Sequence, residues 1–240
     1  IRINGDGSIR MIYQGTSANE TGSGTQIGTS VFNSLSNNNM YVGYMYQSGQ
    51  VHGLTSDSTI KGVLDTWYQN NLQSYASQIS TEAGFCGDRQ PSTSSTTSNG
   101  SGGTGTTQTY YGAYIRLITN KAPTFECTNT ADLYTVGSAN SGNKVLDYPI
   151  GLITADEVAY AGGVYEQTNN GYYLYTNSAY WTMSPYSFGG SYASVFRVNS
   201  VGNLYIIRVD IAWGVRPVIN LAPNVTIKSG NGTSTTPYEI

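Results

Sequence analysis

The sequence predicts a mixed α+β protein in which two helices flank antiparallel sheets joined by long irregular loops. Residues 58–73 and 148–163 have helical patterns, whereas short β-rich runs separated by turn residues occupy both ends of the chain. The chain has 240 residues, which is enough for one large domain or for one domain with an insertion.

The N-terminal segment predicts a hairpin. In "IRINGDGSIRMIYQG", two β-rich runs flank the Gly-Asp-Gly of residues 5–7, which is a tight-turn signal. Asn4 and Asp6 also alternate as in a calcium loop, but the later acidic ligand is absent, so we interpret the segment as a turn. Residues 15–56 are polar and rich in Gly, with short strand-like pieces such as "MYVGYMY" at 40–46.

The first helix is expected over residues 58–73, with weak continuation to about Ser80. Asp57 or Ser58 can cap its start. Apolar residues recur at i, i+3, i+4 and i+7 and so share one helix face: Ile60, Val63, Leu64 and Trp67.

Residues 92–108 are of low complexity and have almost no apolar side chains, which predicts a flexible exposed loop. The following segment, 110–119, is expected to be a strand or a short helix. Cys86 and Cys127 lie at the edges of polar segments around this loop. A disulfide between them would contribute roughly 3–4 kcal/mol in the chain-entropy model; the alternative is two free, buried thiols.

The second helix is opened by a capping box of Thr154 and Glu157, and it ends at the two glycines of residues 162–163. From Tyr173 to Leu221 the chain contains short strand-like runs between turns. They predict an antiparallel meander of "YYLYT", "YWTMSP", "SVFRVNS", "NLYIIRVD" and "GVRPVINL".

The composition argues against several functions. The net charge is −3 with 10% charged residues and no basic block, which gives nucleic-acid binding little support. The chain has 21 Tyr, 5 Phe and 3 Trp among many Ser, Thr, Asn and Gly residues, as in secreted or surface proteins and antibody binding sites. This composition favours both the disulfide and an extracellular or cell-surface location. The alternative is an ordinary soluble β-rich protein with polar loops.

Catalytic signals are weak. His52 is the single histidine; no G-x-S-x-G motif accompanies it, and the Cys and His residues lack zinc-ligand spacing. Helix capping accounts for the adjacent Asp156 and Glu157. Glycoside hydrolysis uses two acids that can be distant in sequence, so a catalytic pair of that kind is not excluded. We therefore expect no enzyme activity, no metal and no cofactor.

The C-terminal half carries a family resemblance. A "W-x-x-SP" strand at 181–185 leads to a Gly-Val-Arg motif at 214–216. With the two helical segments, this resembles the C-type lectin-like fold of variable proteins from diversity-generating retroelements and of related bacterial surface or pilin-like proteins. The resemblance covers most of 1–221 as a single domain with an insert at about 92–108. Residues 222–240 form a C-terminal extension, whose end resembles that of such surface proteins.

Two activities found on this fold are not expected here. Calcium-dependent sugar-binding lectins carry a Trp-Asn-Asp triplet, whereas Trp67, Trp181 and Trp213 are followed by Tyr, Thr and Gly; nor is Gln90-Pro91 followed by Asp. Formylglycine-generating oxidases need cysteines near the C-terminal end, and the last cysteine here is Cys127.

The resemblance implies a division between fixed and substituted positions over 187–215, with the substituted ones confined to 187–213. Six residues match the fixed framework: Val195, Phe196, Val198, Leu204, Val209 and Val215. Arg216 is expected to be partly buried, hydrogen-bonded and structural. Twelve candidate ligand-binding positions match the substituted surface: Ser187, Tyr192, Ser194, Arg197, Asn199, Asn203, Tyr205, Ile206, Arg208, Asp210, Ile211 and Trp213.

Strand alternation refines this division. Ile207 shares a face with Val209, while Ile206 shares the other face with Arg208 and Asp210. The second face would bury two charges if it were core, so we expect it to be exposed and Ile207 to be buried. Tyr205 and Trp213 are also expected to be largely exposed.

These patterns predict a surface-displayed, receptor- or adhesin-type binding protein. Its ligand would be a protein or glycan on another cell or on a phage, recognised without covalent chemistry. The chain starts abruptly in strand-like sequence, so we expect that a preceding segment was removed, and membrane or pilus anchoring would depend on that segment. Two alternatives remain: a pilin-like structural head or tip subunit, and a polysaccharide hydrolase.

Overall fold

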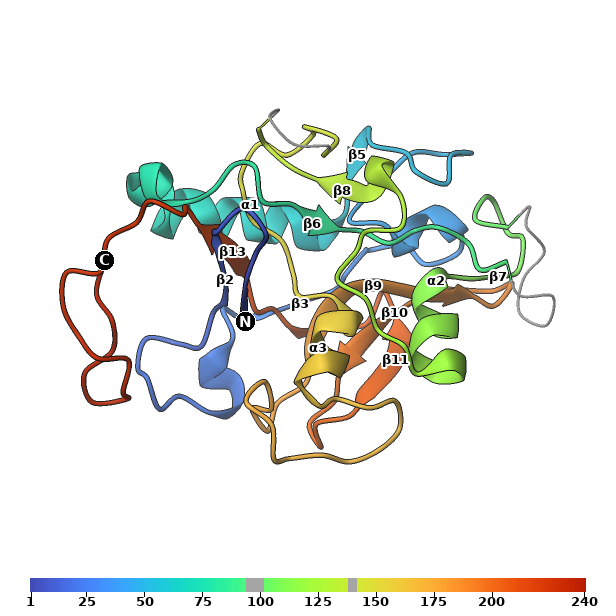
Figure 1. Ribbon diagram of the computed structural model, residues 1–240. Coiled ribbons are helices and arrows are strands. Elements are labelled where there is room, and N and C mark those ends of the chain that lie inside the picture. Colours follow the sequence, from blue (N-terminus) through green and yellow to red (C-terminus); the bar gives the residue numbers. More distant parts are fainter. Residues whose placement is uncertain (94–101, 138–141) are drawn as a thin grey trace.

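The computed structural model describes residues 1–93, 102–137 and 142–240, and its architecture is the predicted mixture of helices and antiparallel sheets (Figure 1). A three-stranded sheet has the order β1-β2-β13, with bounds Arg2–Ile3, Ile9–Ile12 and Val218–Leu221. The larger sheet has the order β11-β10-β9-β12-β3, with β7 paired to β9. Its strands are β3 Thr29–Ser30, β7 Thr109–Tyr110, β9 Tyr180–Phe188, β10 Ala193–Val198, β11 Leu204–Arg208 and β12 Trp213–Gly214. Two small two-stranded sheets complete the set: β4 Met45–Tyr46 with β5 Ser56–Asp57, and β6 Phe85–Cys86 with β8 Leu133–Tyr134.

The N-terminal hairpin is confirmed, and its turn explains the Asn-x-Asp pattern. The Asp6 carboxylate accepts hydrogen bonds from the backbone and hydroxyl of Ser8, at 2.9 and 2.7 Å. Asn4 donates to Ser8 and to Asn220 on β13. These side chains therefore close the turn and join the hairpin to the last strand.

The helix predicted at 58–73 is confirmed as α1, Thr59–Asn71. The Ser58 side chain caps it by accepting from the Lys61 backbone N–H at 3.3 Å. The buried face comprises Ile60, Leu64 and Tyr68, while Trp67 is half-buried at its edge. The weak continuation is a 3₁₀ helix, Gln73–Gln78.

The second predicted helix is α3, Ala155–Ala161, and its capping box is present in both directions. Gly162 ends it at φ 120°, a backbone conformation that favours glycine. Residues 110–119 combine both alternatives: β7 is followed by α2, Gly112–Tyr114, and a π-helical turn, Ile115–Asn120. Three further 3₁₀ helices lie at Gly22–Thr25, Asn39–Val42 and Thr130–Asp132.

The C-terminal meander is confirmed for β9, β10 and β11, which pair in antiparallel order. The later strands leave it: β12 pairs in parallel with β9 and antiparallel with β3, and β13 pairs with β2. The predicted strand "YYLYT" is instead a turn region, because side chains form hydrogen bonds with its backbone. The Leu174 carbonyl accepts from the Tyr180 hydroxyl and from Arg216.

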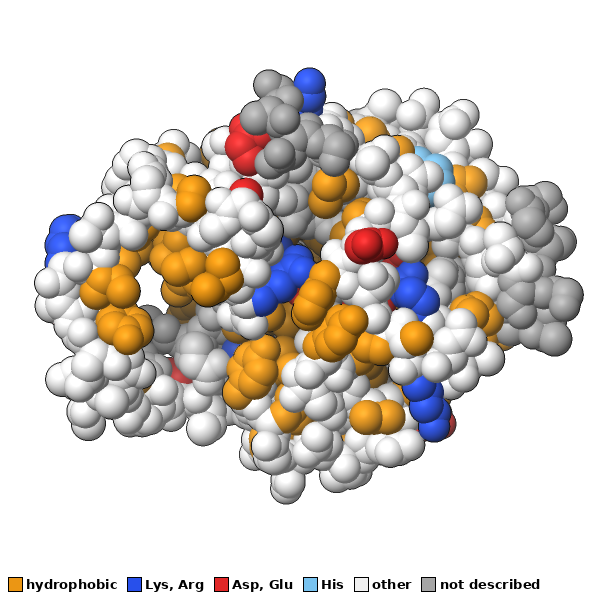
Figure 2. Space-filling view, viewed as in Figure 1, with side chains coloured by type: hydrophobic (Ala, Val, Ile, Leu, Met, Phe, Trp, Pro, Cys, Tyr) orange, Lys and Arg blue, Asp and Glu red, His pale blue; other side chains and the backbone are white. Residues whose placement is uncertain are grey.

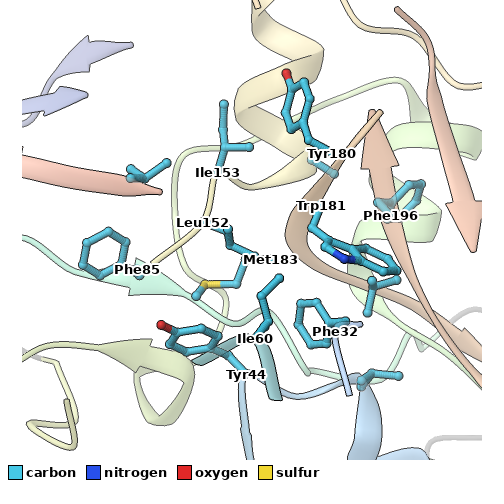
Figure 3. Packing of buried hydrophobic residues seen from close by; sticks show 14 of the residues in the cluster. Phe32, Tyr44, Ile60, Phe85, Leu152, Ile153, Tyr180, Trp181, Met183 and Phe196 are labelled. Carbon is cyan, nitrogen blue, oxygen red and sulfur yellow. The ribbon is translucent and has the colours of Figure 1, made fainter. Parts of the chain in front are cut away.

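The core lies between the sheets and α1, and 11 of the 33 described buried residues in its cluster are aromatic (Figure 3). Phe32 packs edge-on against Trp181, with ring centroids 5.8 Å apart. The polar ends of the buried rings reach backbone carbonyls: the Trp181 indole donates to Ser30 at 2.8 Å and the Tyr44 hydroxyl to Ile150 at 3.2 Å. The Tyr44 hydroxyl and the Trp181 indole N–H are therefore both hydrogen-bonded inside the core.

The segment predicted as a flexible loop, 92–108, is only partly described. Residues 94–101 lie outside the described residues, so the prediction stays open there. Gly102 and Gly103 are buried, and the Asn39 amide donates to three carbonyls within 104–107. The expectation of an exposed loop is therefore wrong for residues 102–103, which are buried, whereas residues 106–108 are exposed as predicted.

The Cys86–Cys127 disulfide is confirmed, with the two Cα atoms 5.5 Å apart. It ties β6 to the loop that precedes the 3₁₀ helix of 130–132. None of the helices in the described ranges is long and apolar enough to cross a bilayer.

Candidate functional site

The six proposed framework residues are more deeply buried than most of the twelve candidate ligand-binding positions. The six framework residues are all at most 1% exposed. Among the twelve candidate positions, Tyr192, Tyr205, Arg208 and Ile211 are exposed, and Asn199, Ile206, Asp210 and Trp213 are half-buried. Four others are buried: Ser187, Ser194, Arg197 and Asn203. The expectation of large exposure therefore holds for Tyr205 and Arg208, whereas Ile206 and Trp213 are half-buried.

Strand register divides these positions between two sides of the sheet. Arg197 on β10 lies opposite Tyr205 on β11, whereas Ser194 lies opposite Arg208 and Phe196 opposite Ile206. Neighbouring register pairs alternate between the two sides of a sheet. Ile207, expected to be buried, is only half-buried, as is Ile206, because β11 is an edge strand of the sheet.

One side carries a buried arginine that lacks acceptors. The Arg197 guanidinium lies 3.8 Å from the Trp213 ring centroid and 5.9 Å from that of Tyr205, and the residue is only 7% exposed. Within the described part of the chain, its Nε and Nη1 have no hydrogen-bond partner, and neither do Trp213 Nε1 and Asn203 Oδ1. Burial lowers the pKa of Arg197, although Tyr205 opposes that shift. An unsatisfied buried polar group typically costs about 1–3 kcal/mol, so these side chains are costly to the fold.

Arg216 shows what a structural arginine looks like in the same protein. It is fully buried over the Tyr180 ring, at 4.7 Å from the centroid. Each of its nitrogens donates: Nε to the Tyr13 carbonyl, Nη1 to the Leu174 carbonyl and Nη2 to the Gln14 side chain. The predicted structural role of Arg216 is confirmed, and Arg197 differs from it in having no such acceptors.

The other side ends in an exposed polar group. The Arg208 guanidinium lies 5.2 Å from the Tyr192 ring and donates from Nε to Asp210 at 3.0 Å. Ser36 donates to the same carboxylate at 3.0 Å. The hydrogen bond from Arg208 is the largest cause that lowers the pKa of Asp210. These side chains are thereby held in defined positions at the surface.

Two tyrosines extend the candidate site and were not predicted. Tyr165, in the loop after α3, stacks within 8° of parallel on both Tyr205 and Tyr186, at centroid distances of 6.3 and 6.4 Å. Phe196 meets Tyr165 and Tyr186 edge-on. Burial raises the pKa of Tyr165 to about 12. No motif marks Tyr165 or Tyr186, so the abundance of Tyr was the single sequence signal for these stacked rings.

The charged residues near the disulfide form a separate cavity of about 260 Å³. Figure 2 shows basic side chains bordered by hydrophobic ones in the middle of the view, over the region between β6 and α3 of Figure 1. The cavity is lined by Arg2, Arg10, Asp88, Arg116, Asp156 and Glu157, among others.

The cavity's carboxylates are already paired. Glu157 binds Arg10 at 2.5 Å and Arg2 at 3.3 Å, while Arg116 bridges Asp88 and Asp156. Asp156 therefore does more than the helix capping assigned to it. Burial raises the pKa of Asp88 to about 6 in spite of Arg116. We interpret this network as structural, because each of these carboxylates forms an ion pair with an arginine.

His52 is likewise engaged on both ring nitrogens. Its Nδ1 lies 3.0 Å from Asp132 Oδ2, and Asn129 Nδ2 lies 3.2 Å from Nε2. Asp132 also accepts from the backbone and side chain of Arg89, so its charge is shared. Over the ranges that the structure describes, no three His, Cys, Asp or Glu side chains gather in a way that could hold a metal ion.

Comparisons of the chain with protein-family models, curated proteins and solved structures find no match.

Proposed function

We propose that this chain is a surface-displayed ligand-binding protein with a C-type lectin-like fold, and that β10, β11 and the residues up to Trp213 carry its binding surface. The observation that carries the proposal is a contrast within one short segment. Val195, Phe196, Val198, Leu204 and Val209 are fully buried, while among the residues between them Tyr205 and Arg208 are exposed and Arg197 is buried with nitrogens that lack partners.

This contrast suits recognition better than packing. Tyr and Arg are enriched at binding hot spots, and a rigid backbone reduces the entropy lost on binding. The α+β architecture with a C-terminal antiparallel meander is compatible with the family resemblance. The ligand is proposed to be a protein or glycan on another cell or phage, met outside the cell.

The test is an array of glycans and cell-surface proteins probed with the purified chain. The face variant is Tyr192→Ala/Tyr205→Ala/Ile211→Ala, which truncates exposed side chains of the site. Its matched control removes two tyrosines and one isoleucine that are also exposed but lie elsewhere: Tyr75, Tyr238 and Ile227.

We expect both variants to fold, and only the face variant to lose its array ligands. Equal binding by the two variants would overturn the proposal. If the face variant instead abolishes self-association of the wild-type chain, the surface packs against a neighbour, as in a structural head or tip subunit.

A further inference from the structure

Arg197 is a buried cation in a place where the fold offers it nothing to bind. Its ring neighbours, Trp213 and Tyr205, cover it but provide no anion. Two of its nitrogens, together with the Trp213 indole N–H, lack an acceptor among the described residues. Several donors of hydrogen bonds thus lie unused at one point of the candidate site.

The missing group must be an acceptor, and its charge should be negative. Arg197 appears in none of the ion pairs of the described chain, whereas the buried Arg10 and Arg89 and the half-buried Arg116 each have a carboxylate partner within 2.5–2.8 Å. A carboxylate has two oxygens with the geometry that guanidinium recognises, and such charge-assisted bonds are strong. Such bonds are stronger where water is excluded, and the rings of Trp213 and Tyr205 cover Arg197 here.

The geometry points to a carboxylate-binding subsite formed by Arg197, Trp213 and Tyr205, which receives an acidic group of the ligand. The inference rests on the proposed function, because it assigns the chemistry of that same surface. Since Arg197 Nε and Nη1 are covered, the ligand's carboxylate reaches them when the half-buried Trp213 side chain moves aside.

This assignment predicts an unusual stability effect. Arg197→Met keeps the length of the side chain and removes a charge that has no partner, so its thermal midpoint should equal or exceed that of the wild type. The matched control is Arg216→Met, which removes a fully buried arginine whose nitrogens all donate. That change should lower the midpoint by several degrees or prevent folding. A large destabilisation by Arg197→Met would show that Arg197 is structural and would overturn the inference.

Binding is tested with sodium glucuronate and a pentaglutamate peptide as probes, against glucose and pentaglutamine, at constant ionic strength. The readout is the ¹⁵N–¹H signal of Arg197 Nε, followed during titration. We expect it to shift saturably with a carboxylate probe, with at least tenfold tighter binding than for the matched neutral probe. Arg197→Met should lose at least tenfold in affinity. The tighter of the two acidic probes identifies an acidic glycan or an acidic protein segment as the source.

The outcomes separate this inference from the proposed function. Equal responses to charged and neutral probes, or unchanged probe binding by Arg197→Met, would overturn the carboxylate subsite. An array ligand that binds Arg197→Met as well as wild type would also overturn it, while leaving the proposed function in place. Arg197-dependent probe binding without any array ligand would support the subsite and count against the proposed function.

Discussion

Reduction of the Cys86–Cys127 disulfide is expected to lower the free energy of unfolding by about 4 kcal/mol. The bridge joins residues 41 positions apart. In the chain-entropy model, closing a loop of that length removes roughly 13 cal/mol/K from the unfolded chain, which is about 4 kcal/mol at 25 °C. For 240 residues at ~2.1 cal/mol/K each, this corresponds to a fall of about 8 °C in the thermal midpoint.

The assay is thermal unfolding followed by circular dichroism, with and without a phosphine reductant. Thiol titration of the unfolded protein should find no free thiol before reduction and two afterwards. The double variant Cys86→Ser/Cys127→Ser should melt like the reduced wild type and should not respond to the reductant. A midpoint that stays within about 2 °C after complete reduction would refute the reasoning, because the loop would then be restrained equally without the bridge.

Three further changes test the packing and electrostatics. Val209→Ala should cost about 2 kcal/mol in urea unfolding, because its side chain is fully buried, whereas Ile211→Ala at the exposed turn should stay within ~0.5 kcal/mol; the reverse order would contradict the assigned burial. Glu157→Gln should cost about 3–5 kcal/mol, since it leaves Arg10 buried without its anion, and a neutral effect in the same assay would show that water screens the pair. The ¹³C signal of the Asp88 carboxyl should titrate near pH 6, because its pKa is raised in the folded state. The stability that Asp88 contributes, about 3 kcal/mol, is therefore complete below about pH 3.8 and is lost as the pH rises through 6. A titration midpoint near pH 4 would contradict this prediction.

Local signals in the sequence were sufficient where the interactions are local. The capping box of Thr154 and Glu157 lies within four residues and is present as predicted. The same holds for the Ser58 cap and for the turn closed by Asp6. Arg216 was assigned correctly from its motif, because its neighbours Val215 and Pro217 are buried.

Pairing between residues far apart in the chain could not be predicted from the sequence. Glu157 pairs with Arg10 across 147 positions, and nothing near either residue indicates the other. The two-residue strands β3 and β12 pair across the chain without any periodic pattern. Arg197 was assigned to the substituted surface from the family resemblance, but all six residues of β10 are buried, so a polar side chain on this strand does not indicate exposure.

The pairing of β2 with β13 also constrains how the chain reaches its native state. Ile9 is in register with Leu221, so the first sheet is complete only when residues from opposite ends of the sequence meet. Closing so long a segment costs entropy before its contacts repay it, and non-local pairing of this kind slows folding. During synthesis, the edge of β2 that pairs with β13 has no partner strand until residues 218–221 have been made. Because an unpaired strand edge can pair with another chain, the N-terminal hairpin is open to premature association during that time.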